Sequence, residues 1–264
     1  MSVPVVLDAE VHPPWWAKAV IVNDWKQPYK VCLRTDCTGA DAPGDALSQV
    51  GELLPLGWDH RSGSEQDCRT RAFLKNQVTV LKEDMCHHSF SNDSADECLL
   101  YVAGSPCQSF SPRNHVRKGW EDRRAELLGK ALKQAANADV ALVENSVSLL
   151  SKANQFLGKI RGRSHVLGSF LTVCGHDSGH KPCLPDRSHM EPMLEELRLA
   201  GFLVHCTRFD PAAMGFCTKR ARMFVFIVKK EKCRFQDERS MGQWIEEAKQ
   251  RVLAAQPVQG NVTD

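Results

Sequence analysis

Short apolar runs alternate with stretches of helical hydrophobic spacing along most of this chain. The runs have the length and side chains of buried strands, and they fall at residues 31–33, 78–81, 99–103, 140–143, 203–206 and 223–228. Between them, apolar side chains recur every three or four residues, as in amphipathic helices, over residues 42–54, 120–138, 149–160 and 189–201. Gly201 is placed to end the last of these helices. This alternation predicts an α/β fold with a doubly wound, mostly parallel sheet and helices on both faces.

Three segments fall outside the alternation. Residues 1–29 hold several tryptophans and prolines without a clear period, which indicates an N-terminal arm laid over the domain. Residues 161–188 are rich in Gly, Ser, His, Arg and Lys and read as a long loop inserted into the main domain, residues 30–228. Residues 229–264 hold one further predicted helix, at about 241–254, and form a short helical tail.

Composition narrows the class of protein. A chain of 264 residues with 42% hydrophobic residues suits one large domain with a sizeable core. Its net charge of +2 means that any binding to nucleic acid must come from local basic clusters. Eleven cysteines, an odd number without a Cys-x-x-Cys pair, indicate a reducing compartment rather than a disulfide framework. The apolar run at residues 3–7 is too short for a signal peptide and no stretch could span a bilayer, so we expect an intracellular protein of the nucleus or cytoplasm, without a membrane partner.

Polar and reactive side chains follow the predicted strands. Ligands of doubly wound sheets bind outside the carboxyl ends of the strands, so these side chains are expected to share one neighbourhood. Gly39, in the turn after the first strand, allows a ligand to approach the backbone, and Glu65 can accept hydrogen bonds from ribose hydroxyls. Asp84 can accept a hydrogen bond from an adenine amino group. The sequence therefore predicts a nucleoside cofactor at this edge.

One thiol stands just beyond the end of an apolar strand. The run at residues 99–103 leads into Pro106 and Cys107, and the proline fixes the backbone before the sulfur. Basic residues follow at positions 113, 117 and 118 and favour a thiolate. Cys107 is therefore a candidate nucleophile, and a buried structural cysteine is the alternative.

Three motifs in chain order resemble those of the cytosine-C5 methyltransferases of nucleic acids, which use S-adenosylmethionine. Pro106-Cys107-Gln108 is similar to the Pro-Cys-Gln nucleophile loop of that family, and Glu144-Asn145 to its Glu-Asn-Val motif. Arg220 and Arg222 match the arginines of its Gln-x-Arg-x-Arg strand. The resemblance covers about residues 31–228 and implies a Rossmann-like methyltransferase sheet.

This chain departs from the family pattern at several positions. Ser146 stands in place of the valine of Glu-Asn-Val, and Thr218 in place of the glutamine of Gln-x-Arg-x-Arg. Of the family's Phe-x-Gly-x-Gly-Gly turn only the first glycine, Gly39, is kept, because Asp41 and Ala42 occupy the other two glycine positions. The residues that carry the chemistry are retained.

The resemblance implies transfer of a methyl group from S-adenosylmethionine to C5 of cytosine in DNA. Cys107 would add to C6 of the base, Glu144 would act as a neutral acid at N3, and Arg222 or Arg220 would stabilise charge near O2. Burial should raise the pKa of Glu144 for that role. Asn145 would orient the neighbouring backbone, and the target base would have to swing out of the duplex.

The resemblance also suggests which residues hold the cofactor. They stand in four segments interpreted as strand ends, at residues 36–44, 64–67, 83–85 and 106–108: Cys37, Thr38, Gly39, Glu65, Gln66, Asp84, Met85 and Pro106. No metal is expected, because the four soft ligands between Cys174 and Cys183 match no standard zinc spacing.

Substrate and activity leave alternatives open. Residues 229–264 are too few for the target-recognition domain that the family carries after the arginine strand, so DNA binding would be weak, unspecific or dependent on a protein partner. RNA is a second possible substrate, since the branch that acts on transfer RNA shares the same motifs. A catalytically silent methyltransferase-like remnant or regulatory partner is the third interpretation. Basic residues of the long loop are candidates for phosphate contacts: Arg161, Arg163, Lys181 and Arg187.

Overall fold

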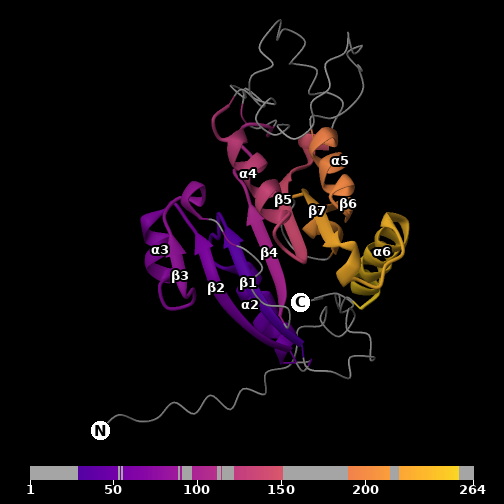
Figure 1. Cartoon of the computed structure of the whole chain (residues 1–264), viewed down its shortest axis with the longest axis horizontal. Coiled ribbons are helices and arrows are strands. Elements are labelled where there is room, and N and C mark those ends of the chain that lie inside the picture. Colours follow the sequence, from indigo (N-terminus) through magenta and orange to yellow (C-terminus); the bar gives the residue numbers. More distant parts are fainter. Residues whose placement is uncertain are drawn as a thin grey trace, which may run out of the picture.

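The described residues form one seven-stranded sheet with the strand order β3-β2-β1-β4-β5-β7-β6 (Figure 1). The computed structural model describes residues 29–52, 54, 56–88, 90, 97–111, 114, 122–150, 190–214 and 220–255. The arm up to residue 28, the loop at 161–188, most of the helix expected at 149–160 and the last nine residues lie outside the described residues, as do Thr218 and the Cys174–Cys183 group. The strands are β1 (Tyr29–Asp36), β2 (Leu56–Ser64), β3 (Val80–Lys82), β4 (Cys98–Gly104), β5 (Val140–Ser146), β6 (Phe202–Phe209) and β7 (Arg222–Lys229).

The predicted α/β fold with a doubly wound, mostly parallel sheet is confirmed. Every neighbouring pair from β3 to β5 is parallel, and only β7 runs antiparallel to both of its neighbours. The strand order reverses between β1 and β4, so the loops after these two strands leave the sheet at its switch point.

Four helices lie between strands in the sequence, and a fifth follows the last strand. They are α2 (Ala42–Gly51), α3 (Cys68–Leu74), α4 (Ala125–Ala135), α5 (Glu191–Leu199) and α6 (Glu238–Ala254). Gly201 ends the turn after α5 with a φ of 90°, as expected from its place in the sequence. The tail helix begins three residues earlier than predicted, because the Asp237 side chain accepts a hydrogen bond from the Ser240 N–H and completes a capping box. Short 3₁₀ helices connect the other elements: η1 (Met85–His87), η3 (Val147–Leu150), η5 (Pro211–Met214) and η6 (Lys230–Lys232).

The hydrophobic pattern did not reveal β2 and α3, although residues 64–67 were expected to follow a strand. Strand β2 carries few apolar residues, and its buried side chains are polar: His60, Ser62 and Ser64 are each at most 3% exposed. A hydrophobicity pattern cannot detect such a strand, because its inward side chains pack through hydrogen bonds rather than apolar contact.

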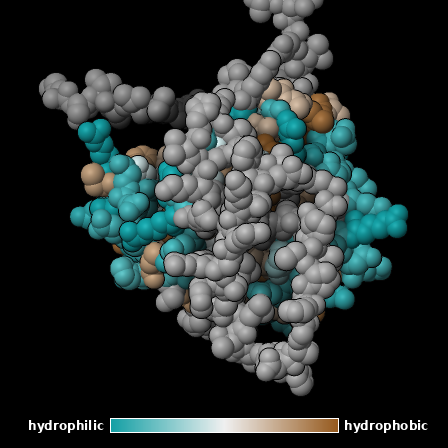
Figure 2. Space-filling model, turned by 90° about the horizontal axis from the view of Figure 1, so that it is seen from above, coloured by the Kyte–Doolittle hydropathy of each residue, from teal (hydrophilic) through white to brown (hydrophobic). Residues whose placement is uncertain are grey.

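The core lies on both faces of the sheet. One cluster packs α4 and α5 against β4, β5 and β7, and it includes Tyr101, Leu128, Leu194 and Ile227. A second cluster packs α6 against β6 and β7 and includes Val228, which points away from its neighbour Ile227 because successive strand residues alternate. No helix among the described residues has the length and apolar character needed to cross a bilayer. The described surface in Figure 2 is mainly hydrophilic at both flanks.

Candidate active site

The loops that follow β1, β2, β3 and β4 meet at one edge of the sheet and enclose a cavity of about 450 Å3. Six of the eight residues predicted to hold a cofactor line it: Cys37, Glu65, Gln66, Asp84, Met85 and Pro106. The sequence did not single out the remaining wall, which α4 and the residues before it supply through Arg123, Arg124, Glu126, Leu127 and Lys130. Order in the chain gave no signal for this wall, because α4 reaches the cavity only through its packing on β4 and η1.

Thr38 and Gly39 shape the turn after β1 rather than line the cavity. The Thr38 N–H and hydroxyl both donate to the Ser64 carbonyl, at 3.1 and 3.0 Å. Gly39 has a φ of 59°, and its N–H donates to Glu65 Oε2 at 2.8 Å. The other oxygen of Glu65 accepts from the Asp67 N–H at 2.9 Å. The backbone of two loops therefore fixes the Glu65 carboxylate at the cavity.

The other side chains of the cavity differ in their ionisation. Burial, with the charges of Asp36 and Glu65, raises the pKa of the Cys37 thiol to about 12, so this sulfur is no candidate nucleophile. Hydrogen bonds from the Cys86 side chain and N–H hold the pKa of Asp84 below its ordinary value. Asp84 is thus a carboxylate that can accept further hydrogen bonds.

The loop after β4 presents Cys107 beside this cavity. Cys107 is partly exposed, and its carbonyl accepts from the N–H groups of Phe110 and Ser111 at 3.1 and 2.8 Å. Pro106 lines the cavity and Cys107 does not. The candidate nucleophile therefore directly follows a residue of the cavity wall without lining the cavity itself.

Asn145 fastens this loop to β5. Its side chain is fully buried, and its amide donates to the Ser105 hydroxyl at 2.9 Å and to the Ser105 carbonyl at 3.3 Å. The amide oxygen accepts from the Ser146 N–H at 2.7 Å. Asn145 thus orients the backbone immediately before Pro106, and these three hydrogen bonds lie in the interior, where they are strong.

Glu144 lies beside the last residue of β4. The register pairs it with Gly104, and a Cβ built on Gly104 would lie 3.8 Å from Glu144 Oε2 and 3.6 Å from the Cys37 carbonyl. Glu144 Oε1 is 2.6 Å from Nε of Arg222, on β7. Burial raises the pKa of Glu144, although the charges of Arg222 and Arg220 act in the opposite direction.

The two arginines have different places. Arg222, the first residue of β7, forms the ion pair with Glu144, whereas Arg220 precedes the strand and is exposed. Both line a second pocket of about 310 Å3 whose wall is otherwise apolar, with Phe209, Phe224 and Phe226 among its residues. The structure therefore brings Arg222 into contact with the carboxyl group and leaves Arg220 at the rim of the neighbouring pocket.

A different nucleophile is suggested by distances alone. The Ser62 hydroxyl lies 2.8 Å from His88 Nε2, and His88 Nδ1 lies 2.7 Å from Asp36 Oδ1, in the order of a Ser-His-Asp triad. All three residues are at most 3% exposed, and the Ser62 hydroxyl also accepts from Arg34 at 3.2 Å. Because no substrate can reach Ser62, the arrangement is structural.

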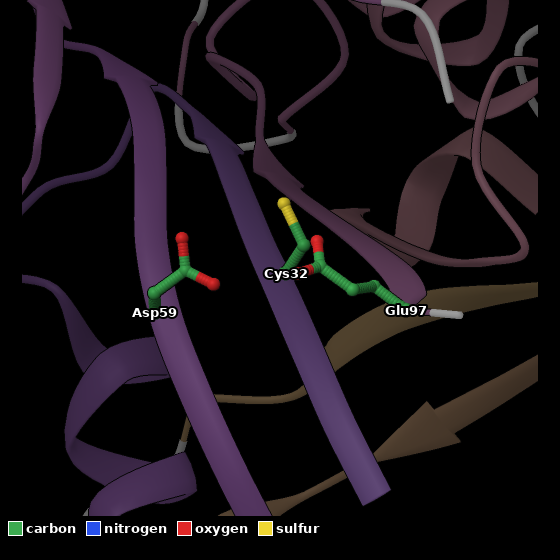
Figure 3. A group of neighbouring side chains, drawn as sticks. All are labelled: Cys32, Asp59 and Glu97. Atoms are coloured by element: carbon green, nitrogen blue, oxygen red, sulfur yellow. The ribbon is translucent and has the colours of Figure 1, made fainter. Parts of the chain in front are cut away.

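One group of side chains has the composition of a metal site. Cys32, Asp59 and Glu97 bring their ligand atoms within 4.8 Å of one another from β1, β2 and the residue before β4 (Figure 3). Arg61 contacts Asp59 at 3.1 Å and Glu97 at 2.8 Å, and Lys30 also pairs with Glu97. Two cations thus balance the two carboxylates, and burial raises the pKa of the Cys32 thiol. We interpret the group as an ion-pair network.

No protein-family model matches this chain, and no curated protein matches it. It is similar to several solved structures. They include the Entamoeba histolytica methyltransferase EhMeth, with 12% identity over 79% of this chain and 55% of that one and a TM-score of 0.48. A prophage protein of E. coli described as a DNA modification methyltransferase gives 14% identity, 76% and 47% coverage and a TM-score of 0.46. The Dnmt2 methyltransferase of S. pombe has 12% identity over 78% of this chain and 52% of that one, with a TM-score of 0.44. The chain spans about half the length of the structures it matches. Likeness at this level carries no chemistry, so function has to be argued from this chain's own residues.

Proposed function

We propose that this chain is a methyltransferase that moves a methyl group from S-adenosylmethionine to C5 of cytosine in DNA through a covalent adduct of Cys107. The main support is the arrangement around the end of β4. There Asn145 holds the backbone before Pro106 and Cys107, while Glu144, in register with Gly104, is paired with Arg222 at 2.6 Å. The thiol stands in the loop after β4, and the carboxyl group and the guanidinium come from β5 and β7, the next two strands of the sheet.

The cavity has features that suit the cofactor. Its volume of about 450 Å3 falls in the range of small-molecule sites. Glu65 and Asp84 offer carboxylate oxygens for ribose and adenine hydrogen bonds, and Met85, Pro106 and Leu127 offer apolar surface for a purine ring. When bound, S-adenosylmethionine supplies an electrophilic methyl group on a positively charged sulfur.

The proposed reaction begins with the thiolate of Cys107. It adds to C6 of the cytosine, and the electron pair of the C5–C6 double bond moves toward N3 and O2, which makes C5 nucleophilic. Glu144, whose pKa is raised by burial, donates a hydrogen bond to N3 when it is protonated, and Arg222 stabilises charge at O2. C5 would then take the methyl group, and the electron pair of the broken S–CH3 bond would stay on the sulfur of the departing S-adenosylhomocysteine. Loss of the C5 proton to water and departure of the Cys107 thiolate would restore the C5–C6 double bond.

The raised pKa of Glu144 is the electrostatic support for its role. In the free protein its carboxyl group contacts Arg222, and a base bound beside this carboxyl group would exclude more water. Further desolvation would raise the pKa again and favour the neutral acid.

Trapping of the adduct tests this proposal. Duplex DNA that contains 5-fluorocytosine, incubated with the protein and S-adenosylmethionine, should give a complex that survives denaturing electrophoresis, because fluorine at C5 cannot leave as a proton does. Cys107→Ser should abolish the complex. Cys68→Ser, which changes an exposed thiol on α3, should leave it intact.

The outcomes separate the three interpretations. An adduct with fluorinated transfer RNA but not with DNA would replace DNA by RNA as the substrate. No adduct with either nucleic acid, while calorimetry shows that S-adenosylmethionine binds, would refute the catalytic proposal and leave a silent, cofactor-binding partner.

A further inference from the structure

A chain of buried hydrogen bonds centres on His60 of β2 and reaches residues 37–41, the turn after β1 that we call the cofactor turn. The ring Nε2 of His60 lies 2.9 Å from the Thr35 hydroxyl, and Nδ1 lies 3.0 Å from Asp41 Oδ2. The Thr35 hydroxyl lies 2.7 Å from that of Thr38, which donates to the Ser64 carbonyl at 3.0 Å. Four elements therefore meet at one imidazole: the end of β1, the turn, the cap of α2 and β2.

The direction of these bonds follows from counting protons. Each hydroxyl has one proton to donate. The Thr38 proton goes to the Ser64 carbonyl, so the Thr35 proton goes to Thr38, and His60 Nε2 must be the donor to Thr35. Since a carboxylate only accepts, the bond to Asp41 needs a proton on Nδ1 as well, so both ring nitrogens of His60 donate.

Water cannot replace these partners. His60 and Asp41 are each 3% exposed, and Thr35 and Thr38 are 1% and 8% exposed. An unpaired donor or acceptor at such a depth is strongly unfavourable, because it loses its bonds to water without gaining others. The network is therefore expected to keep its geometry whether or not a ligand is bound.

Two glycines leave the space that the network needs. A Cβ on Gly63 would lie 2.8 Å from the Thr35 hydroxyl and 3.1 Å from the Thr38 hydroxyl, and a Cβ on Gly44 would overlap the Asp41 carboxylate. The first helical turn of α2 also uses Asp41, whose side chain accepts from the Gly44 N–H at 3.3 Å. Backbone and side chains here are fitted to one another.

The turn is one that needs such support. Cys37 and Asp41 have φ values of 52° and 61°, the left-handed region that side chains other than glycine's rarely adopt. A residue held there persists only when its surroundings determine its conformation. Asp41 stands at a position where the Phe-x-Gly-x-Gly-Gly pattern has glycine, and the carboxylate that it brings is the one bound by His60.

We propose that His60 is a positioning residue for cofactor binding, which holds Asp41 in a conformation that glycine would adopt unaided. This proposal rests on the proposed function only in that the cavity binds S-adenosylmethionine. The effect of His60 on the cavity passes through the cofactor turn. His60 holds Thr38 through Thr35, and the adjacent Gly39 N–H donates to Glu65. This bond keeps the Glu65 carboxylate in place at the cavity. Loss of His60 should loosen the turn and weaken binding while the sheet remains folded.

Two substitutions of His60 each keep one of the two hydrogen bonds of its ring. The amide nitrogen of His60→Asn reaches the Nδ1 position and can keep the bond to Asp41, whereas that of His60→Gln reaches the Nε2 position and can keep the bond to Thr35. Because Asp41 is the residue in the unfavourable conformation, we expect the dissociation constant for S-adenosylmethionine to rise about tenfold or more in His60→Gln and less in His60→Asn.

A second change should rescue the first. Asp41→Gly supplies a residue that adopts the left-handed conformation freely, so the double variant His60→Gln, Asp41→Gly should bind the cofactor more tightly than His60→Gln alone. Glycine is also tolerated at the N-cap position, which Asp41 occupies in α2. A merely structural role of His60 would not give this rescue, because the double variant removes still more of the buried bonds.

The matched control is His205→Gln. His205 is a partly buried histidine on β6 that faces Gly242 of α6, and it belongs to the second core cluster's side of the sheet. This variant should lower the thermal midpoint without changing cofactor affinity. Calorimetric titration gives the dissociation constants, and thermal unfolding gives the stability of every variant.

Amide hydrogen exchange without ligand separates this proposal from the proposed function. In His60→Gln the amides of Gly39 and Asp41 should exchange faster than in the unsubstituted chain, while those of β4 and β5 do not change. Faster exchange with no cofactor binding by the unsubstituted chain would refute the proposed function alone. Unchanged exchange, or unchanged affinity in His60→Gln when the unsubstituted chain binds, would overturn the role of His60.

Discussion

Tyr101→Phe measures the contribution of a single hydroxyl to the buried carboxylate of Asp36. Asp36 Oδ2 accepts from the Tyr101 hydroxyl at 2.7 Å, while Oδ1 accepts from Ser64 and His88. Asp36 and Tyr101 are both 0% exposed, so water cannot take the place of the lost donor. Burial and the neighbouring Asp36 hold the pKa of Tyr101 well above its ordinary value, which keeps the proton on the hydroxyl.

The expected loss follows from these contacts. Removing a hydrogen bond to a carboxylate and leaving the acceptor unsatisfied should lower the free energy of unfolding by about 2–3 kcal/mol. For a chain of this size the thermal midpoint should fall by about 4–12 °C. Urea unfolding followed by tryptophan fluorescence, with the slope compared between variants, gives the free energy directly.

Thr207→Val is the control for this measurement. The Thr207 hydroxyl donates to Glu246 at 2.9 Å, but the Glu246 side chain is 49% exposed and also binds Lys249. Water can satisfy this carboxylate, so the loss should be about 0.5–1 kcal/mol. If Tyr101→Phe is no more destabilising than Thr207→Val, burial does not set the strength of these bonds and the reasoning is refuted.

Three further predictions concern acid chemistry, thiol reactivity and packing. Since the neutral form of Glu144 is the proposed active form and its pKa is raised, the rate of methyl transfer should fall as the pH rises through that pKa. Glu144→Gln should lower the rate about 10²–10³-fold and remove this decline from the pH–rate profile. A decline that persists in the variant would belong to another group. With its pKa raised to about 12, the Cys37 thiol should react with iodoacetamide at pH 8 about a hundredfold more slowly than the exposed Cys86 of the same cavity. Mass spectrometry of the labelled peptides measures the two rates, and equal labelling would contradict the burial of Cys37. Leu128→Ala, at a side chain that is 0% exposed in α4, should lower the free energy of unfolding by about 2–5 kcal/mol in urea titration, whereas Leu199→Ala, at 81% exposure, should change it by less than about 0.5 kcal/mol.

The sequence was informative where apolar side chains carried the pattern. Five of the six predicted runs lie within strands, because Leu99, Val143 and Ile227 belong to segments whose burial demands a hydrophobic face. The sixth, at residues 78–81, overlaps the short and largely exposed β3 at two residues. It failed at β2, since His60 and Ser64 are buried through hydrogen bonds that a hydrophobicity pattern does not register. The same polar strand carries the network beneath the cofactor turn.

For the candidate site, the sequence supplied residue types and the order of the strand ends. The place of Glu65, Asp84 and Pro106 after successive strands was enough to predict that they share a neighbourhood, and they line one cavity. The choice between Arg220 and Arg222 needed the antiparallel register of β7, which sets Arg222 against Glu144. The wall contributed by α4 likewise needed the packing of that helix.

Local chemistry thus determined which segments of this protein become strands and helices and which residues stand at their ends, because periodicity and turn residues act over a few positions along the chain. Only the tertiary structure decided which of those residues touch. The pairing of Glu144 with Arg222 and of His60 with Asp41 joins residues far apart in sequence, and such contacts depend on strand order, register and the room left by Gly63 and Gly44.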